Sequence, residues 1–299
     1  MSSASARSSA PLEEAVRARY SAASRQVEAQ LCCPVDYDPR FLDVIPSEVL
    51  ERDYGCGDPS RHVHEGDCVL DLGSGGGKIC FIAAQIVGRA GRVIGVDMNE
   101  DMLALARSAA PVVAARLGYD NVAFRRGRIQ DLTLDLDALE AWLRDHPVCD
   151  LESLRALEAK RVALRREAPL VADASVDVVV SNCVLNLVRQ EDKAQLFREV
   201  FRVLREDGRL TISDIVSDAP VPEHLRADPE LWSGCISGAF QDEVLLRAIE
   251  ESGFHGIRLE ESAAEPFAVV EGITFRSVTV AAGKGGAGGN CSSEAGCCR

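Results

Sequence analysis

Short apolar runs alternate with longer amphipathic stretches through the middle of the chain. The run at 176–181 is dominated by valine and is apolar on both faces, as is typical of a parallel strand buried between helices. This alternation predicts an α/β fold, a doubly wound Rossmann-like sheet with helices on both faces. The strands are expected at 68–72, 91–97, 122–126, 176–181 and 208–214, and the helices at 78–87, 99–117 and 193–204.

The apolar pattern changes at three places, which predicts four regions. The first region begins with a flexible Ser/Ala-rich segment and continues as a helix over 11–30. A Leu-, Ala-, Glu- and Arg-rich insertion at 132–170 interrupts the second region, and we expect a helical hairpin packed on the rim of the sheet. The third region is α+β and ends in a strand at 275–282, whereas the last is Gly- and Cys-rich and expected to be flexible. The regions are 1–30, 31–215, 216–283 and 284–299.

The composition is that of a globular protein with an acidic surface. The chain has 299 residues, of which 46% are hydrophobic and 27% charged, so it can bury a full core. Its 33 basic and 47 acidic residues give a net charge of −14, which repels nucleic acid and anionic membranes. No apolar stretch approaches the roughly 20 residues that span a bilayer, and the chain start lacks the apolar core of a signal peptide. We expect a cytoplasmic monomer that acts on a small molecule and binds neither nucleic acid nor membranes.

A glycine cluster follows the first predicted strand. Gly73, Ser74 and Gly75 stand where the strand turns into a helix, and glycine there lets a cofactor approach the backbone. An acidic residue, Asp71, comes just before the cluster, which distinguishes it from the dinucleotide GxGxxG motif and from a phosphate-binding P-loop. Asp71 is therefore expected to face an ammonium group rather than a phosphate.

Further candidate residues follow the second and third predicted strands. Asp97 ends the second strand, beside Met98, and is positioned for two hydrogen bonds to ribose hydroxyls. Alone, Asp97 could be no more than the neighbour of a helix N-cap. Together with Asp71 and the glycines it favours a cofactor site, because these elements lie at strand carboxyl ends in the right order. Ile129 and Gln130, after the third strand, would flank adenine.

This order of motifs resembles the class I S-adenosylmethionine-dependent methyltransferases over residues 67–214. The resemblance implies S-adenosyl-L-methionine as the cofactor and leaves the methyl acceptor open. Asn182 and Cys183 come just past the fourth strand, so they are expected beside the reactive methyl group. Region 31–215 would then be the cofactor-binding domain, and region 216–283 would bind the substrate.

The chain has eleven cysteines but no CxxC pair, so neither a zinc ribbon nor a thioredoxin-type site is indicated. Cys56, Cys183 and Cys235 stand in unusual local contexts, and two of them are flanked by glycines. In these contexts the chain resembles the arsenite methyltransferases, and the resemblance spans about 54–240 apart from the insertion. It implies that these three thiolates hold trivalent arsenic in the catalytic site. The matching segments are 54–57, 181–187, 212–216 and 234–239.

Elementary chemistry agrees with that implication. Soft thiolates prefer soft, thiophilic centres, and three of them would leave the lone pair of trivalent arsenic free. That lone pair can attack the methyl group in line, so the reaction needs positioning rather than a general base. The five histidines follow no catalytic or metal-binding pattern and are interpreted as surface or structural residues. They are His62, His64, His146, His224 and His255.

The family resemblance also implies a reduction step. Methylated arsenic becomes formally pentavalent and is reduced by a protein dithiol, which a thiol reductant such as glutathione or thioredoxin restores. Cys32 and Cys33 occupy the place of the family's N-terminal redox cysteine, and either could pair with Cys56.

The remaining cysteines have simpler interpretations. Cys68, Cys80 and Cys149 are interpreted as small buried hydrophobic residues without chemistry. The thiols of the last region either capture arsenic and deliver it or are incidental. They are Cys291, Cys297 and Cys298.

Two features depart from the family pattern, the insertion and the segment 34–39, and both border the expected acceptor pocket. One alternative is therefore a methyltransferase for another soft or small organic acceptor, with structural cysteines. Serine at position 183 or 235 would leave such an enzyme active. A second alternative is a metalloid-binding protein without catalysis, which the complete cofactor motif disfavours.

Overall fold

The computed structural model describes residues 10–28, 31, 35–261 and 265–285. They contain a nine-stranded sheet in the order β3-β2-β1-β4-β5-β9-β7, with β6 beside β5 and β8 beside β9. Strands β1 to β5 are parallel, and β9 runs antiparallel to its neighbours. The doubly wound sheet predicted from the sequence is confirmed. The strands are β1 (Cys68–Leu72), β2 (Arg92–Asp97), β3 (Val122–Arg126), β4 (Val176–Asn182), β5 (Leu204–Ser217), β6 (Phe240–Gln241), β7 (His255–Glu261), β8 (Ala268–Val270) and β9 (Ile273–Gly283).

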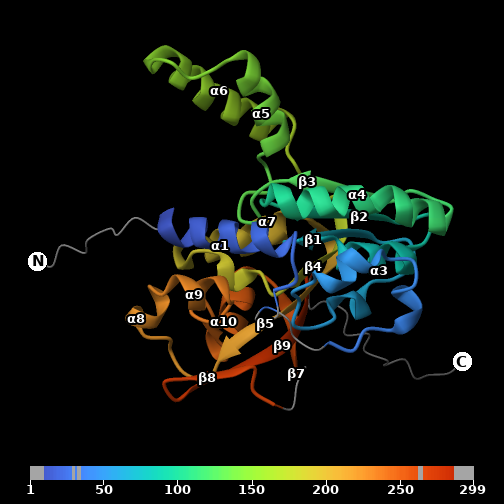
Figure 1. Ribbon diagram of the computed structural model, residues 1–299, viewed down its shortest axis with the longest axis vertical. Helices are drawn as coiled ribbons and strands as arrows, with labels where there is room; N and C mark the ends of the chain where they lie inside the picture. Colours follow the sequence, from blue (N-terminus) through green and yellow to red (C-terminus); the bar gives the residue numbers. More distant parts are fainter. Residues whose placement is uncertain (1–9, 29–30, 32–34, 262–264, 286–299) are drawn as a thin grey trace, which may run out of the picture.

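Helices lie on both sides of this sheet (Figure 1). In the part of the chain that the structure describes, none of them is long and apolar enough to cross a membrane. The α-helices are α1 (Ala10–Ala23), α2 (Ser47–Glu51), α3 (Lys78–Val87), α4 (Glu100–Leu117), α5 (Leu136–Asp145), α6 (Leu151–Glu167), α7 (Lys193–Val203), α8 (Glu223–Arg226), α9 (Pro229–Ser233) and α10 (Asp242–Glu251). Short 3-10 helices are η2 (Pro39–Phe41), η3 (Pro59–His62), η4 (Leu185–Leu187) and η5 (Gln190–Asp192).

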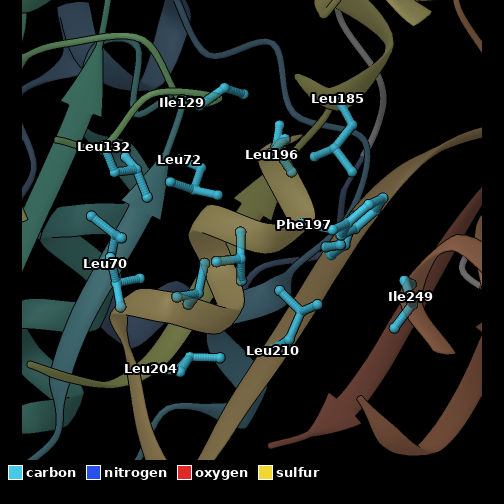
Figure 2. Close-up of a cluster of buried hydrophobic side chains, with 14 of the residues drawn as sticks. Leu70, Leu72, Ile129, Leu132, Leu185, Leu196, Phe197, Leu204, Leu210 and Ile249 are labelled. Carbon is cyan, nitrogen blue, oxygen red and sulfur yellow. The ribbon is translucent and has the colours of Figure 1, made fainter. Parts of the chain in front are cut away.

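Apolar side chains cover both faces of the sheet. In β1, Leu70 and Leu72 belong to one core, to which α7 contributes Phe197 (Figure 2). Val69 belongs to the opposite core, together with Phe81 of α3. Successive side chains of a strand alternate between faces, so a strand covered on both sides is apolar at nearly every position. The valine-rich runs of the sequence follow from this arrangement.

The helix after β2 starts where the sequence predicts. Asn99 Oδ1 accepts hydrogen bonds from the backbone N–H groups of Asp101 at 3.0 Å and Met102 at 3.1 Å, which caps α4. The cap ends the strand at Asp97, so this carboxylate lies at the edge of the sheet where β1 and β4 also end.

Two boundaries predicted from the sequence differ from the structure. Helix α1 ends at Ala23 rather than near residue 30. Strand β5 begins at Leu204 rather than at residue 208, and it continues to Ser217 because β9 pairs with it along nine residue positions from Arg209 to Ser217. Pairing with β9, which is distant in sequence, sets the length of β5, so the local pattern of apolar residues does not predict it.

The insertion forms the predicted helical hairpin, but the expected packing on the rim is wrong. Helices α5 and α6 stand away from the rest of the molecule (Figure 1). No residue of α5 is buried, and α6 buries Leu164 near its base. The apolar side chains of α6 are few, and Leu157 lies with Leu139 and Leu143 of α5 around a common hollow rather than against the sheet. The start of α6 is fixed locally, by a capping box between Asp150 and Ser153.

Candidate active site

A cleft of about 1210 Å³, counting the space open to solvent, lies at the carboxyl ends of β1, β2 and β4. All of the residues that the sequence nominated for the cofactor line this cleft. They are Asp71, Gly73, Ser74, Gly75, Asp97, Met98, Ile129, Gln130, Asn182 and Cys183. Open α/β sheets bind ligands in this position.

The glycine turn is shaped for close approach. Gly73 has a φ of 70°, and a Cβ at this position would lie 2.4 Å from Val184 Cγ2. Gly75 is also left-handed, with a φ of 50°, and its N–H donates to Asp97 Oδ2 at 2.9 Å. The buried Ser74 Oγ lines the cleft and has no hydrogen-bond partner among the described residues, so it is available to a polar ligand. These features fit S-adenosylmethionine.

A buried carboxylate, Asp71, and a half-buried one, Asp97, give the cleft its electrostatic character. Asp71 is 2% exposed, and burial raises its pKa to about 7, with the charge of Asp97 adding to the effect. Burial also raises the pKa of Asp97, although hydrogen bonds from the N–H groups of Asn99 and Gly75 oppose the rise. A cation placed between the carboxylates would offset the free-energy cost of ionising each of them in this site. The ammonium and sulfonium of S-adenosylmethionine are such cations.

The three motif cysteines meet in one buried cluster beside the cleft. Cys56, Cys183 and Cys235 belong to the same apolar core, and Cys183 also lines the cleft. Hydrogen bonds to the thiols of Cys235 and Cys56, together with burial, raise the pKa of Cys183 well above its ordinary value. Burial likewise raises the pKa of Cys56. Both groups are therefore protonated thiols near neutral pH while no ligand is bound.

The Cys183 thiol is hydrogen-bonded to the other two thiols, but the three are not arranged as a preformed metal site. Among the residues that the structure describes, no three His, Cys, Asp or Glu side chains are arranged to hold a metal ion. The Cys235 thiol instead donates to the Cys183 carbonyl oxygen at 3.2 Å. A soft ligand would have to displace the thiol protons and draw the sulfurs around itself.

Two of the three cysteines have an unusual backbone. Cys183 has a φ of 58° and Cys235 a φ of 62°. Both values lie in the left-handed region, which residues other than glycine seldom adopt. Cys183 is nevertheless fixed there, because its N–H donates to Ser213 O at 2.8 Å. Strained residues of this kind gather at functional sites.

The third cysteine is held by close backbone packing. A Cβ on Gly55 would lie 2.2 Å from Asn182 Nδ2, and one on Gly57 would lie 2.6 Å from Ser213 Cβ. Asn182 Oδ1 accepts from the N–H groups of Cys56 at 2.9 Å and Gly57 at 3.2 Å. The flanking glycines thus let the Cys56 segment lie against β4 and β5. Asn182, which was predicted to bind the cofactor, therefore also fixes the backbone of Cys56.

Sequence reasoning missed several residues that support the cluster. Asn186 Nδ2 donates to Ile215 O at 2.7 Å and to Cys235 O at 3.1 Å. Lys193 is 3% exposed, its amine donates to Gly238 O, and burial lowers its pKa to about 7. Tyr20 OH lies 3.7 Å from Cys235 Sγ. Asn186 lies inside the segment 181–187, which resembles the arsenite methyltransferases. No local sequence pattern distinguishes Lys193 or Tyr20.

The other cysteines have different positions. Cys149 is exposed rather than buried, because it lies in the turn between α5 and α6, so its predicted burial is wrong. Cys68 is half-buried, and Cys80 is buried and donates to Asp71 Oδ2 at 3.2 Å. No histidine lines the cleft in the described ranges. The remaining candidates lie outside the described residues, namely Cys32, Cys33, Cys291, Cys297 and Cys298.

Comparison with known proteins gives the same family in sequence and in structure. A methyltransferase domain model matches residues 63–166 and 158–253. An arsenite methyltransferase of Aquipseudomonas alcaligenes is 34% identical over 252 residues, which is 83% of this chain and 62% of that protein. Another from Halobacterium salinarum is 37% identical over 207 residues, which is 69% of this chain and 42% of that protein. The chain thus spans about half the length of these curated relatives.

A solved structure agrees with these relatives. The arsenic(III) S-adenosylmethionine methyltransferase of Chlamydomonas reinhardtii superposes with a TM-score of 0.64 at 30% sequence identity. The match covers 84% of this chain and 75% of that one. On that similarity, the chain belongs to the arsenite methyltransferase family of S-adenosylmethionine-dependent methyltransferases.

Proposed function

We propose that this protein methylates trivalent arsenic while Cys183, Cys235 and Cys56 hold it. One observation carries the proposal: the three motif thiols form a single buried cluster, and one of them, Cys183, lines the cofactor cleft. Family membership supports it further. The reaction suits the cytoplasm, where thiols stay reduced, and a monomer would suffice because all of the proposed ligands come from one chain.

The cofactor would lie along the carboxyl edge of the sheet. Asp97 would accept hydrogen bonds from the ribose hydroxyls, and Ile129 and Gln130 would flank adenine. Asp71 would face the ammonium, which explains why an acidic side chain is buried there. S-adenosylmethionine, when bound, supplies an electrophilic methyl group. The protein contributes orientation and a site from which most water is excluded.

Capture of the acceptor is a ligand exchange. Arsenite, or a thiol conjugate of it, would exchange each hydroxide or thiolate ligand for a cysteine sulfur. With arsenite, one As–O bond and one S–H bond break, one As–S bond forms, and the thiol proton leaves with hydroxide as water. The thiol need not ionise beforehand, because its proton leaves in the water, so the high pKa of Cys183 is no obstacle. No oxidation state changes. The arsenic lone pair stays free for in-line attack on the methyl carbon.

A reduction step would complete the cycle. Methylation leaves arsenic formally pentavalent, and two protein thiols would return two electrons to it by forming a disulfide. We assign Cys56 to this pair, with either Cys32 or Cys33 as its partner. Glutathione or thioredoxin would then reduce the disulfide by thiol exchange.

The direct test incubates the purified full chain with arsenite, a thiol reductant and S-adenosylmethionine, and separates the arsenic species by mass. Mono- or dimethylated arsenic is expected. Cys183→Ser and Cys235→Ser should each lower the rate by at least about 100-fold, because oxygen is a poor ligand for a soft centre. Cys149→Ser, at the exposed hairpin turn, is the matched control. Full activity of the first two variants would favour an organic acceptor.

A further inference from the structure

Helix α1 brings one side chain from the start of the chain to the thiol cluster. Tyr20 lines the cleft, and its hydroxyl lies 3.7 Å from Cys235 Sγ. Its ring packs edge-to-face on Tyr54, with 6.1 Å between ring centroids and 82° between planes. Tyr20 thus contacts both Cys235 and a residue two positions before Cys56.

The helix that carries Tyr20 is anchored on the segments around the site. Asn99, next to the cofactor loop, donates from Nδ2 to Arg17 O at 3.1 Å. Tyr54 OH donates to Ala23 O at 2.9 Å, and Arg19 Nη1 donates to Ser233 Oγ at 3.1 Å. Helix α1 also packs against α4 and α9. These contacts hold the Tyr20 hydroxyl at a fixed place relative to the thiols.

The hydrogen bonds of Cys235 change when arsenic replaces its proton. In the protein without ligand, the Cys235 thiol donates to Cys183 O at 3.2 Å. An arsenic-bound sulfur has no proton and cannot donate, but it still accepts hydrogen bonds. The Tyr20 hydroxyl keeps its proton when the cysteines bind arsenic, so it can still donate a hydrogen bond. It can therefore serve the sulfur in the bound state, where the contact to Cys183 O is lost.

We propose that Tyr20 is a positioning residue for the arsenic acceptor, acting through a hydrogen bond from its hydroxyl to the arsenic-bound sulfur of Cys235. The inference rests on the proposed function and deepens it. The bond fixes the direction of the sulfur and stabilises its anionic character. The hydroxyl faces Cys235, so its removal acts on the acceptor, whereas the ring, which lines the cleft, stays in place when phenylalanine replaces tyrosine.

The test replaces the hydroxyl and keeps the ring. Tyr20→Phe should raise the Kd and the KM for arsenite about fivefold, as expected for one lost hydrogen bond. The KM for S-adenosylmethionine and kcat at saturating arsenite should stay within about twofold, because the packing on Tyr54 remains. Arsenite binding is measured by equilibrium dialysis with detection of arsenic by mass, and cofactor binding is measured separately.

Two further variants separate positioning from general damage. Tyr119→Phe removes another tyrosine hydroxyl, which contacts Ala84 O at 3.4 Å away from the cleft, and it should behave as wild type. In a Cys235→Ser background, Tyr20→Phe should change residual arsenite binding by less than about 1.5-fold, since coupled residues give non-additive effects.

Three results would overturn the inference. They are a wild-type Kd for arsenite in Tyr20→Phe, an equal rise in both KM values, and an undiminished effect in the Cys235→Ser background. The proposed function fails differently, when the wild-type protein binds arsenite but forms no methylated arsenic. The dialysis result still decides the role of Tyr20 in that case, because it needs no turnover.

Discussion

Cys183 and Cys235 occupy left-handed backbone positions, with φ values of 58° and 62°. At such positions a Cβ is the source of the strain, and glycine removes it. Function rather than local stability therefore explains why a thiol stands there. This interpretation predicts an unusual order of stability among variants.

Glycine should be better tolerated than alanine at both cysteines. Cys183→Gly and Cys235→Gly should each unfold with a free energy about 1 kcal/mol higher than the matching alanine variants, because glycine accepts a positive φ. Cys80 is the control, since it lies inside α3, where Gly should be about 1 kcal/mol less stable than Ala. Urea denaturation measures all six variants. The same order at all three positions would contradict the strain argument.

Asp71 should make the stability of the protein without cofactor depend on pH. Its pKa of about 7 lies above the ordinary 3.8, so the folded state binds its proton more tightly than the unfolded state. The contribution of Asp71 to stability is therefore fully present below about pH 4 and is lost as pH rises to about 7. Asp71→Asn should remove this fall, gaining on the order of 4 kcal/mol at pH 8 and almost nothing at pH 4.

Urea unfolding of both proteins without cofactor, at pH 4.5 and pH 8, checks the expectation for Asp71. The same variant should bind S-adenosylmethionine more weakly at pH 8, because the cation loses its carboxylate. A difference in stability that is equal at the two pH values would show that ionisation of Asp71 is not its cause.

Residues with a local signature could be predicted, and residues defined by distant contacts could not. Asp71, Asp97 and the glycines stand at strand ends in a fixed order, so the sequence alone located them at the cleft. Tyr20 and Lys193 act on segments more than forty positions away, through the contacts to Cys235 and Gly238. No periodicity or spacing encodes such a contact.

At the scale of elements, the loop between α9 and β6 carries Cys235 into the cluster. This loop packs so closely on η4 that a Cβ on Gly238 would lie 1.9 Å from Asn186 O. The clash is with backbone, so the loop itself has to move. Its position, and hence the Cys235 thiol, depends on the absence of a side chain there.

Gly238→Ala should displace the loop and weaken arsenite binding. We expect a loss of about 1–3 kcal/mol in the free energy of unfolding, as for other overpacked sites. Arsenite affinity should fall about tenfold or more, while S-adenosylmethionine affinity stays close to wild type. Gly66→Ala is the control, because Gly66 has a φ of 83° but no atom of the described part of the chain lies within 4 Å of the added Cβ. Equal effects on arsenite binding in the two variants would argue against the packing explanation.

Elements were predictable where their own side chains decide them. Helix α4 follows from its Asn99 cap, and α6 from the capping box at Asp150. The length of β5 was not predictable, because its partner β9, distant in sequence, sets it. The projection of the hairpin was missed for a related reason. Helical periodicity identifies helices but does not show whether a core exists to receive them.

At the scale of the whole molecule, the hairpin is the part least connected to the site. Residues on it remain strongly exposed, including Leu151 at 63% and Val162 at 61%. Its base is tied by ion pairs, such as Arg107 to Asp137 at 2.6 Å and Arg165 to Asp131 at 2.7 Å. Ion pairs that are exposed or half-exposed, as these two are, contribute little to stability. The fold and the cleft should therefore not depend on the outer part of the hairpin.

Replacing residues 141–160 with a short Gly/Ser linker tests this independence. The span removed contains none of the buried residues of α5 or α6, since Leu164 lies beyond it, and both ion pairs at the base stay in place. The melting temperature should change by no more than about 4 °C, and the Kd for S-adenosylmethionine should stay within about twofold. Calorimetry of the shortened and full chains, with the arsenite assay on both, provides the measurement. If the shortened chain binds the cofactor normally but no longer methylates arsenic, the hairpin is instead part of the acceptor site. Such a role was expected from the sequence, where the insertion borders the predicted acceptor pocket.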